Sequence, residues 1–207
     1  TILNGCQPLP FLVDQAENAT EENRLKYRYI HLRHPVMVRN LRVRHLAAQA
    51  ARRFLSDQDF LEVETPLLIK TTPEGARDYV VPSRIHHGQF YALPQSPQLY
   101  KQILMAGGVD RYFQLARCLR DEDLRKDRQP EHTQIDLEMS FVTEEEIYEV
   151  VEEMVAAIFA EAAGIDLPTP FPRISYDDAM NLYGSDKPDL RFGCPIHNLD
   201  DLVPGCG

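Results

Sequence analysis

The strongest constraint on the fold is a pair of alternating segments that flank one charged loop. The segments are RYFQLARCLR (111–120) and TQIDLEMSFV (133–142), and the loop is DEDLRKDRQPEH (121–132). Apolar and polar residues alternate in each segment, as in a β-strand that turns one face to the core. Two such strands around one loop predict an antiparallel hairpin. A loop of this length is usually functional or disordered.

One face of this hairpin is unusually polar, because it carries Arg120, Gln134, Asp136 and Glu138. The plainest interpretation is an antiparallel sheet that exposes this face to water. The alternative is a ligand site, since arginine grips phosphate or carboxylate groups and carboxylates suit an ammonium group or a metal ion. A site with both signs of charge suggests a substrate with both signs, such as an amino acid together with a nucleotide triphosphate.

The sequence offers no glycine-rich phosphate loop. Neither G-x-x-x-x-G-K-[ST] nor G-x-G-x-x-G occurs in it. Both motifs bind phosphate through backbone N–H groups at the start of a helix. Any nucleotide must therefore be held by side chains on a sheet, which excludes the P-loop and Rossmann solutions.

The remaining patterns predict an α+β protein. Helical spacing of apolar residues predicts one helix over about 35–56 and another from Thr143, which forms a capping box with Glu146, to Gly164. Alternation predicts a strand over 60–69, and shorter strands and a further helix follow from local turn signals. With 43 % hydrophobic residues, the chain has enough apolar side chains for a core.

The segment QSPQLYKQ (95–102) begins a predicted helix with several polar residues. Gln98 and Lys101 are three residues apart, so they share one helix face near its start. Leu99 and Ile103 fall on another face and are expected to pack inward. The polar residues either simply begin the helix or hold a ligand.

Charge is unevenly distributed along the chain. The formal net charge of −10 argues against non-specific nucleic-acid binding by the whole surface. Residues 23–56 nevertheless contain nine Lys or Arg and no Asp or Glu, whereas residues 144–166 contain eight Asp or Glu and no Lys or Arg. The plainest interpretation of the basic segment is a solvated helix face, and a contact with RNA is the alternative.

Features that the sequence lacks bear on the location of the protein and on the state of its cysteines. It has no apolar run of about 18 residues and no signal peptide, so we expect no membrane span. We expect a fragment, because the chain does not start with Met, and we place it in the cytoplasm with an organelle left open. Without zinc-site spacing, the four cysteines are expected to be free thiols, and no metal site is assigned. They are Cys6, Cys118, Cys194 and Cys206.

Several segments resemble the class II aminoacyl-tRNA synthetases, and among them the bacterial-type aspartyl enzymes. FQLARCLRDEDLRKDRQPEHTQIDLEMSF resembles motif 2 of the class, and RRFLSDQDFLEVETPLL resembles motif 1. TPEGARDYVVPSR and ALPQSPQLYKQ are similar to the flipping loop and the amino-acid pocket, and YGSDKPDLRFG to the stretch before an inserted domain. The resemblance implies a class II core, with a mainly antiparallel sheet flanked by helices.

The resemblance also implies a division of the chain. Residues 1–22 would be a linker from an N-terminal anticodon-binding domain, and residues 23–193 the catalytic core with motifs 1 and 2. Residues 194–207 would be an unmatched tail or the start of an insertion. The third motif, with its Gly-x-x-Arg core, is not found, so the core is expected to be incomplete at its C-terminal end and inactive alone.

The implied reaction is ATP-dependent activation of L-aspartate to aspartyl adenylate, followed by transfer to tRNA, in a homodimer that uses Mg²⁺. Arg120 would be the catalytic residue, on the α-phosphate and the substrate carboxylate. ATP would be bound by Arg120, Asp121, Glu122 and Gln129, with Arg128 near its terminal phosphates. Aspartate would be bound by Glu74, Gln98, Lys101 and Arg120, assisted by Ser96 and Asp136, with Lys101 on its side-chain carboxylate and Glu138 near the magnesium ion.

Two alternatives stay open. A truncated, non-catalytic paralogue that acts as a binding module would also lack the third motif. The asparaginyl and lysyl enzymes share the architecture of the aspartyl enzymes. Lys101 favours a substrate with an acidic side chain over one with an amide or an amine.

Overall fold

The structure is a computed structural model that describes residues 1, 3–5, 7–72, 74–123, 125 and 128–199. It divides into two compact units, Thr1–Thr169 and Pro170–Gly207. None of the helices in the described ranges is both long and apolar enough to cross a membrane. Cys118 and Cys194 are free thiols, and Cys6 and Cys206 lie outside the described residues.

The first unit begins with short helices that the sequence analysis did not predict. They are a 3-10 helix at Val13–Asn18, α1 (Glu21–Lys26) and α2 (Arg28–His31). Thr20 begins α1, because its Oγ1 accepts a hydrogen bond from the N–H of Asn23 at 3.3 Å. The predicted long helix follows as α3 (Pro35–Asp57), with proline at its first position.

A three-stranded sheet forms the centre of this unit, in the order β1–β4–β5. Its strands are β1 (Leu61–Glu62), β4 (Arg111–Leu119) and β5 (Glu131–Met139). β4 and β5 are antiparallel, as the alternating segments predicted, and Gln114 lies opposite Asp136. β1 runs parallel to β4, so the sheet is mixed. The strand expected over 60–69 is confined to two residues, and Pro66 is one reason, since it has no N–H for a sheet hydrogen bond.

A second, two-stranded ribbon and the helix after it complete this part of the chain. The ribbon consists of the antiparallel strands β2 (Val80–Pro82) and β3 (Phe90–Ala92). Ala92 also forms a bridge with Ile69, which ties the ribbon to the segment after β1. The helix predicted at this point is α4 (Gln98–Ala106), with Pro97 as its cap.

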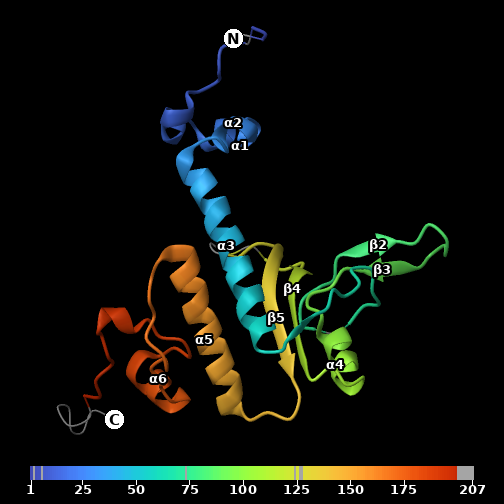
Figure 1. The fold of residues 1–207 in the computed structure, drawn as a ribbon, viewed down its shortest axis with the longest axis vertical. Helices are drawn as coiled ribbons and strands as arrows, with labels where there is room; N and C mark the ends of the chain where they lie inside the picture. The colour runs from blue at the N-terminus through green and yellow to red at the C-terminus, as the bar shows by residue number, and fades with distance from the viewer. Residues whose placement is uncertain (2, 6, 73, 124, 126–127, 200–207) are drawn as a thin grey trace. The chain divides into compact units, whose positions relative to one another are not determined.

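The core lies between the sheet and two helices, α3 and α5 (Glu144–Ala163), which run side by side (Figure 1). Leu55, Phe60, Phe113 and Met154 meet there, each at most 5 % exposed. Burial of one such side chain contributes about 1.5–3 kcal/mol. The predicted capping box is confirmed, because the N–H of Thr143 donates to Glu146 Oε2 at 2.7 Å.

The opposite face of the sheet is covered by α4. Side chains alternate along β4, so Tyr112 and Gln114 point away from the face that carries Phe113. The reading of this polar face as exposed to water is wrong, since Gln114 is 8 % exposed and Cys118 is fully buried. Leu99 and Ile103, expected to pack inward, are exposed, because Lys101 takes the inward position on α4.

The second unit contains α6 (Tyr176–Tyr183) and a 3-10 helix at Leu190–Phe192. α6 begins at Ser175, whose Oγ accepts a hydrogen bond from the N–H of Asp178 at 3.0 Å. It ends at Gly184, which has the left-handed backbone conformation typical of a helix end. Of the predicted tail, residues 200–207 lie outside the described residues.

Candidate active site

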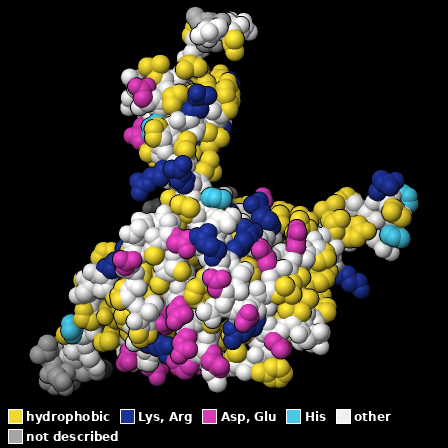
Figure 2. Space-filling model, in the orientation of Figure 1, with side chains coloured by type: hydrophobic (Ala, Val, Ile, Leu, Met, Phe, Trp, Pro, Cys, Tyr) yellow, Lys and Arg dark blue, Asp and Glu magenta, His cyan; other side chains and the backbone are white. Residues whose placement is uncertain are grey.

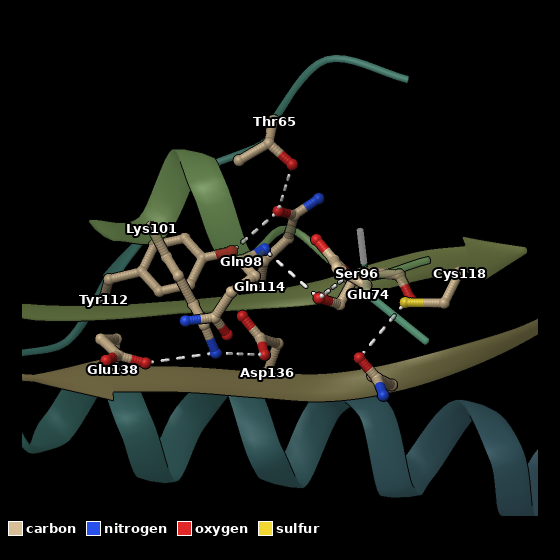
Figure 3. A network of polar contacts seen from close by, with 12 residues as sticks. Thr65, Glu74, Ser96, Gln98, Lys101, Tyr112, Gln114, Cys118, Asp136 and Glu138 are labelled. Carbon is tan, nitrogen blue, oxygen red and sulfur yellow. Dashed lines mark hydrogen bonds and ion pairs between the residues drawn. The ribbon is translucent and has the colours of Figure 1, made fainter. Parts of the chain in front are cut away.

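A lysine and two carboxylates form the centre of the covered face (Figure 3). Lys101 Nζ on α4 lies 2.8 Å from Asp136 Oδ1 and 3.2 Å from Glu138 Oε2 on β5. The side chains of Lys101 and Asp136 are each 10 % exposed, and that of Glu138 is 34 % exposed. Asp136 and Glu138 are two residues apart on a strand, so both point toward α4.

The charges of this cluster do not cancel. Burial alone would lower the pKa of Lys101, but hydrogen bonds and charges from Asp136 and Glu138 outweigh burial and raise it. The lysine is therefore a cation between two acidic side chains. The second oxygen of Asp136, Oδ2, is buried and accepts no hydrogen bond of ordinary length from the described residues. The cluster thus has an excess carboxylate and an acceptor that suit a bound ammonium group.

The start of α4 is joined to the loop before the ribbon. Ser96 Oγ donates to Glu74 Oε2 at 2.9 Å and accepts from the N–H of Gln98 at 3.3 Å. Thr72 Oγ1 donates to the other oxygen of Glu74 at 3.1 Å. Ser96, Glu74 and Gln98, which the resemblance assigned to one pocket, therefore lie together at the start of α4 (Figure 3).

Gln95 holds the same loop through hydrogen bonds to Ala76 and Asp78, and sequence reasoning missed this role. Its side chain is 2 % exposed, accepts from the N–H of Ala76 at 3.1 Å and donates to the carbonyl of Ala76 at 2.8 Å. It also donates to Asp78 Oδ1 at 2.5 Å. Burial would raise the pKa of Asp78, but the hydrogen bonds from Gln95 and Thr71 outweigh it and lower that pKa. The only signal in the sequence was a second glutamine beside Ser-Pro.

Arg120 stands where the hairpin strand passes into its loop. Its Nε donates to the carbonyl of Gln95 at 3.3 Å, and its N–H donates to the carbonyl of Pro130 at 2.8 Å. A cavity of about 350 Å³ opens beside it, lined by Arg120, Glu122, Asp123, Arg128, Gln129, Pro130 and His132. Three of the four residues assigned to ATP thus line one cavity, and Asp123 and His132 were missed.

Asp121, the fourth residue assigned to ATP, lies apart from that cavity. Its N–H donates to the carbonyl of Arg77 at 3.1 Å, and its carboxylate is 3.8 Å from the Arg77 guanidinium. Both residues line a neighbouring hollow that also contains Arg128. Asp121 therefore joins the loop after Glu74 to the root of the hairpin loop.

A layer of buried polar side chains supports the lysine cluster. Tyr112 is fully buried, and its hydroxyl donates to Gln114 Oε1 at 2.9 Å. Thr65 Oγ1 donates to the same oxygen at 3.0 Å. Burial raises the pKa of Tyr112, and the charge of nearby Asp136 raises it further. Sequence reasoning assigned no role to any of the three.

The arrangement combines two chemically different parts. The cluster at α4 offers one cation, two carboxylates and an open acceptor, which together suit a small zwitterion with an extra acidic group. The cavity at the hairpin loop offers two arginines with acidic and amide neighbours, which suit a polyphosphate. Arg120 joins the two parts through its hydrogen bond to Gln95, the residue before Ser96.

The fold and the site together define a class II synthetase core. Its parts are the long helix α3, the short strand β1, the polar pocket covered by α4, and the strand–loop–strand of β4 and β5 with Arg120 at the root of its loop. The family described as tRNA synthetases class II (D, K and N) matches residues 20–201. The chain belongs to this family, as the resemblance of its motifs indicated.

Its curated relatives include aspartate–tRNA ligases. The enzyme named aspartate–tRNA ligase of Geobacillus kaustophilus is 57 % identical over 202 residues, which are 98 % of this chain and 34 % of the relative. The aspartate–tRNA(Asp/Asn) ligase of Bacillus cytotoxicus is 55 % identical over 207 residues, which are 100 % of this chain and 35 % of the relative. The chain therefore spans about a third of the length of these relatives.

Solved structures agree on the fold. An asparaginyl-tRNA synthetase from Pyrococcus horikoshii, complexed with asparaginyl-adenylate, superposes with a TM-score of 0.78 at 25 % identity, over 96 % of this chain and 48 % of that one. A protein described as an aspartyl-tRNA synthetase of Leishmania major superposes with a TM-score of 0.68 at 28 % identity, over 77 % of this chain and 31 % of that one. The predicted α+β class II core is confirmed.

Proposed function

We propose that this chain supplies the aspartate-activating core of an aspartate–tRNA ligase. The observation that carries the proposal is the buried cluster of Lys101, Asp136 and Glu138 next to the cavity at Arg120. A buried ammonium group favours a substrate carboxylate over an amide and repels an amine. This supports aspartate over asparagine or lysine, and the names of the curated relatives support the same choice.

Aspartate would bind across the cluster. Lys101 would hold its side-chain carboxylate, and the open oxygen of Asp136 would accept from its ammonium group. Glu74, Ser96 and Gln98 would complete the ammonium site from the loop and the helix start, where hydrogen bonds already join them. The α-carboxylate would then face Arg120.

ATP would occupy the cavity at the hairpin loop. Arg120 would bridge the α-phosphate and the α-carboxylate of aspartate, since a planar guanidinium can hold two anions in a fixed geometry. Glu122 and Gln129 would contact ATP from the cavity wall, Arg128 would lie near the terminal phosphates, and Asp121 would act from the neighbouring hollow.

The reaction then needs positioning and charge neutralisation rather than a protein nucleophile. An oxygen of the α-carboxylate attacks the α-phosphorus in line. The new O–P bond forms as the bond to the bridging oxygen breaks, and pyrophosphate leaves with that electron pair. A hydroxyl of the terminal adenosine of tRNA next attacks the acyl carbon, AMP leaves, and the hydroxyl proton is released. Arg120 offsets the negative charge that develops at phosphorus.

Magnesium fits this site only in company with ATP. Proteins bind Mg²⁺ through one or two carboxylates together with substrate phosphates. Glu138 is the carboxylate that suits it, because its side chain is one-third exposed at the edge of the cluster. Among the described residues no group of three His, Cys, Asp or Glu side chains could hold a metal ion. When bound, the ion would neutralise charge on the leaving pyrophosphate.

Pyrophosphate exchange tests this function directly. We expect the full-length product of the reading frame to catalyse exchange that requires aspartate, with asparagine and lysine as inactive controls. We expect the 207-residue chain alone to give at most trace exchange, because no third motif is found in it. A full-length product without aspartate-dependent exchange would favour the binding-module alternative, for which the comparisons give no support. Robust exchange by the 207 residues would refute the need for a third motif.

The division of the chain and its location remain part of the proposal. Residues 1–22 would link to an anticodon-binding domain, 23–193 would form the core, and 194–207 would be a tail or the start of an insertion. A cytoplasmic location is supported by the bacterial origin of the relatives. tRNA would be the macromolecular substrate.

We also propose that the protein forms a homodimer. Val36, Val38 and Leu41 in the first half of α3 are 48–57 % exposed, and apolar side chains continue along α1 and α2 (Figure 2). Three arginines of the basic segment already have partners within the fold. Arg44 donates to Thr133, Arg52 to Glu62, and Arg53 pairs with Glu161. The exposed apolar side chains therefore remain for a second copy of the chain.

Leu41→Asp is expected to convert the dimer into monomers. The side chain is 57 % exposed, so the substitution costs the monomer little, but it places a charge in a buried subunit contact. Sedimentation equilibrium measures the change. Ile174→Asp, at a residue 40 % exposed in the second unit, is the matched control and should leave the dimer intact. An unchanged dimer constant in Leu41→Asp would place the contact elsewhere.

A further inference from the structure

Aspartate binding, as proposed above, would remove the ion-pair partner of Asp136. In the structure Lys101 is its ion-pair partner at 2.8 Å, and the side chains of both are 90 % removed from water. When Lys101 turns to the substrate carboxylate, Oδ1 of Asp136 loses that partner. A buried carboxylate that loses its partner is strongly destabilised. The substrate ammonium group is assigned to Oδ2, so Oδ1 needs a donor of its own, and a protein group already next to it can supply one.

The hydroxyl of Tyr112 is in the right place to be that donor. Tyr112 and Gln114 occupy β4 positions directly opposite Glu138 and Asp136 on β5, and all four point to the same face. Figure 3 shows the ring of Tyr112 alongside the side chain of Lys101, with its hydroxyl toward Gln114. The influence of Asp136 on the pKa of Tyr112, through charge and hydrogen bonding, agrees with this proximity.

The present acceptor of the hydroxyl proton has a second donor. In the structure the proton points to Gln114 Oε1, which accepts a second hydrogen bond from Thr65 at 3.0 Å. If the proton of Tyr112 turned away, this oxygen would keep Thr65 as a donor and would not be left unsatisfied. Rotation of one O–H bond moves no heavy atom, so the turn is compatible with the complete burial of Tyr112.

We propose that Tyr112 is a positioning residue whose hydroxyl turns from Gln114 to Asp136 as Lys101 leaves Asp136 for the substrate. Thr65 makes the turn possible by keeping Gln114 satisfied. Tyr112 touches neither substrate directly. It lowers the cost of releasing Lys101 and so acts on aspartate binding but not on ATP binding. The inference rests on the proposed function, because it requires a substrate carboxylate at Lys101.

Tyr112→Phe tests the inference, because it keeps the ring and removes only the hydroxyl. We expect the KM for aspartate in pyrophosphate exchange by the full-length product to rise roughly tenfold, as for loss of one hydrogen bond to a charged group. The KM for ATP and the thermal midpoint should stay close to those of the parent. An equal rise in both KM values would indicate a structural role and overturn the proposal, as would an aspartate KM within about twofold of the parent.

Two further variants separate the turn from ordinary packing. Thr65→Val removes the second donor to Gln114 and should raise the aspartate KM as well, and Thr65→Ser should restore it. The effect of Tyr112→Phe should shrink when Asp136 is already Asn, because no charge then needs the hydroxyl. Independent effects of the two substitutions would overturn the inference while leaving the proposed function intact. A parent that neither exchanges pyrophosphate nor binds aspartate in calorimetry would overturn both.

Discussion

Arg120→Ala is expected to lower aspartate-dependent pyrophosphate exchange by the full-length product about a thousandfold. Arg120 lies at the root of the hairpin loop, on the wall of the cavity assigned to ATP. Charge on the α-phosphate grows in the transition state, so the loss should fall on kcat more than on either KM. Arg120→Lys keeps the charge but loses the planar, two-anion grip, and we expect intermediate activity.

Arg117→Ala is the matched control for this prediction. Arg117 lies three residues before Arg120, in β4, and points to the other face, where it pairs with Glu131 and its side chain is 54 % exposed. Exposed ion pairs of this kind contribute at most about 1 kcal/mol, so activity should stay within about twofold of the parent. Comparable losses in Arg117→Ala and Arg120→Ala, at comparable thermal midpoints, would refute a specific role for Arg120.

The parts of the fold with strong local patterns could be predicted from the sequence. Strict alternation on both sides of one loop gave the hairpin of β4 and β5, and the Thr143–Glu146 pair gave the start of α5. The strand over 60–69 could not be bounded in this way. Its length depends on a parallel partner, β4, about fifty residues further along the chain, and only two of its residues pair with that partner.

The predicted orientation of α4 was wrong for a related reason. Hydrophobicity placed Leu99 and Ile103 inward, but the inward position belongs to Lys101, because carboxylates on β5 make a buried cation favourable there. Amphipathic patterns assume an apolar partner surface. A helix that covers a polar ligand site breaks that assumption, and the exception itself marks the site.

The residues of the candidate site also fall into those that could be predicted from the sequence and those that could not. Residues in recognisable motifs, such as Lys101 and Arg120, could be assigned a role by resemblance. Gln95 and Thr65 could not, because they contact residues far away in sequence, and the role inferred for Tyr112 depends on Asp136 on the neighbouring strand. Thr65 and Gln114 are 49 positions apart, and Gln95 meets Ala76 19 positions away. Neither separation has a periodic signature, so only the three-dimensional arrangement reveals them.

Lys101→Ala is expected to raise the KM for aspartate in pyrophosphate exchange about a hundredfold or more, with little change in the KM for ATP. Removing one partner of a buried charge pair typically costs a ligand about 2–5 kcal/mol of affinity. Preference for aspartate over asparagine should fall with it, because the ammonium group is what distinguishes a carboxylate from an amide. Lys70→Ala, at an exposed lysine, is the control and should leave both KM values unchanged.

The same substitution should also destabilise the empty protein, and this must be separated from the loss of binding. Without Lys101, Asp136 and Glu138 lie side by side with no cation between them. The free energy of unfolding should therefore fall by about 3 kcal/mol. Adding Asp136→Asn removes one of the uncompensated charges, so the double variant should recover stability but not aspartate affinity. Recovery of both would mean that Lys101 serves the fold alone. A folded Lys101→Ala protein with the parent KM for aspartate would place the substrate carboxylate elsewhere.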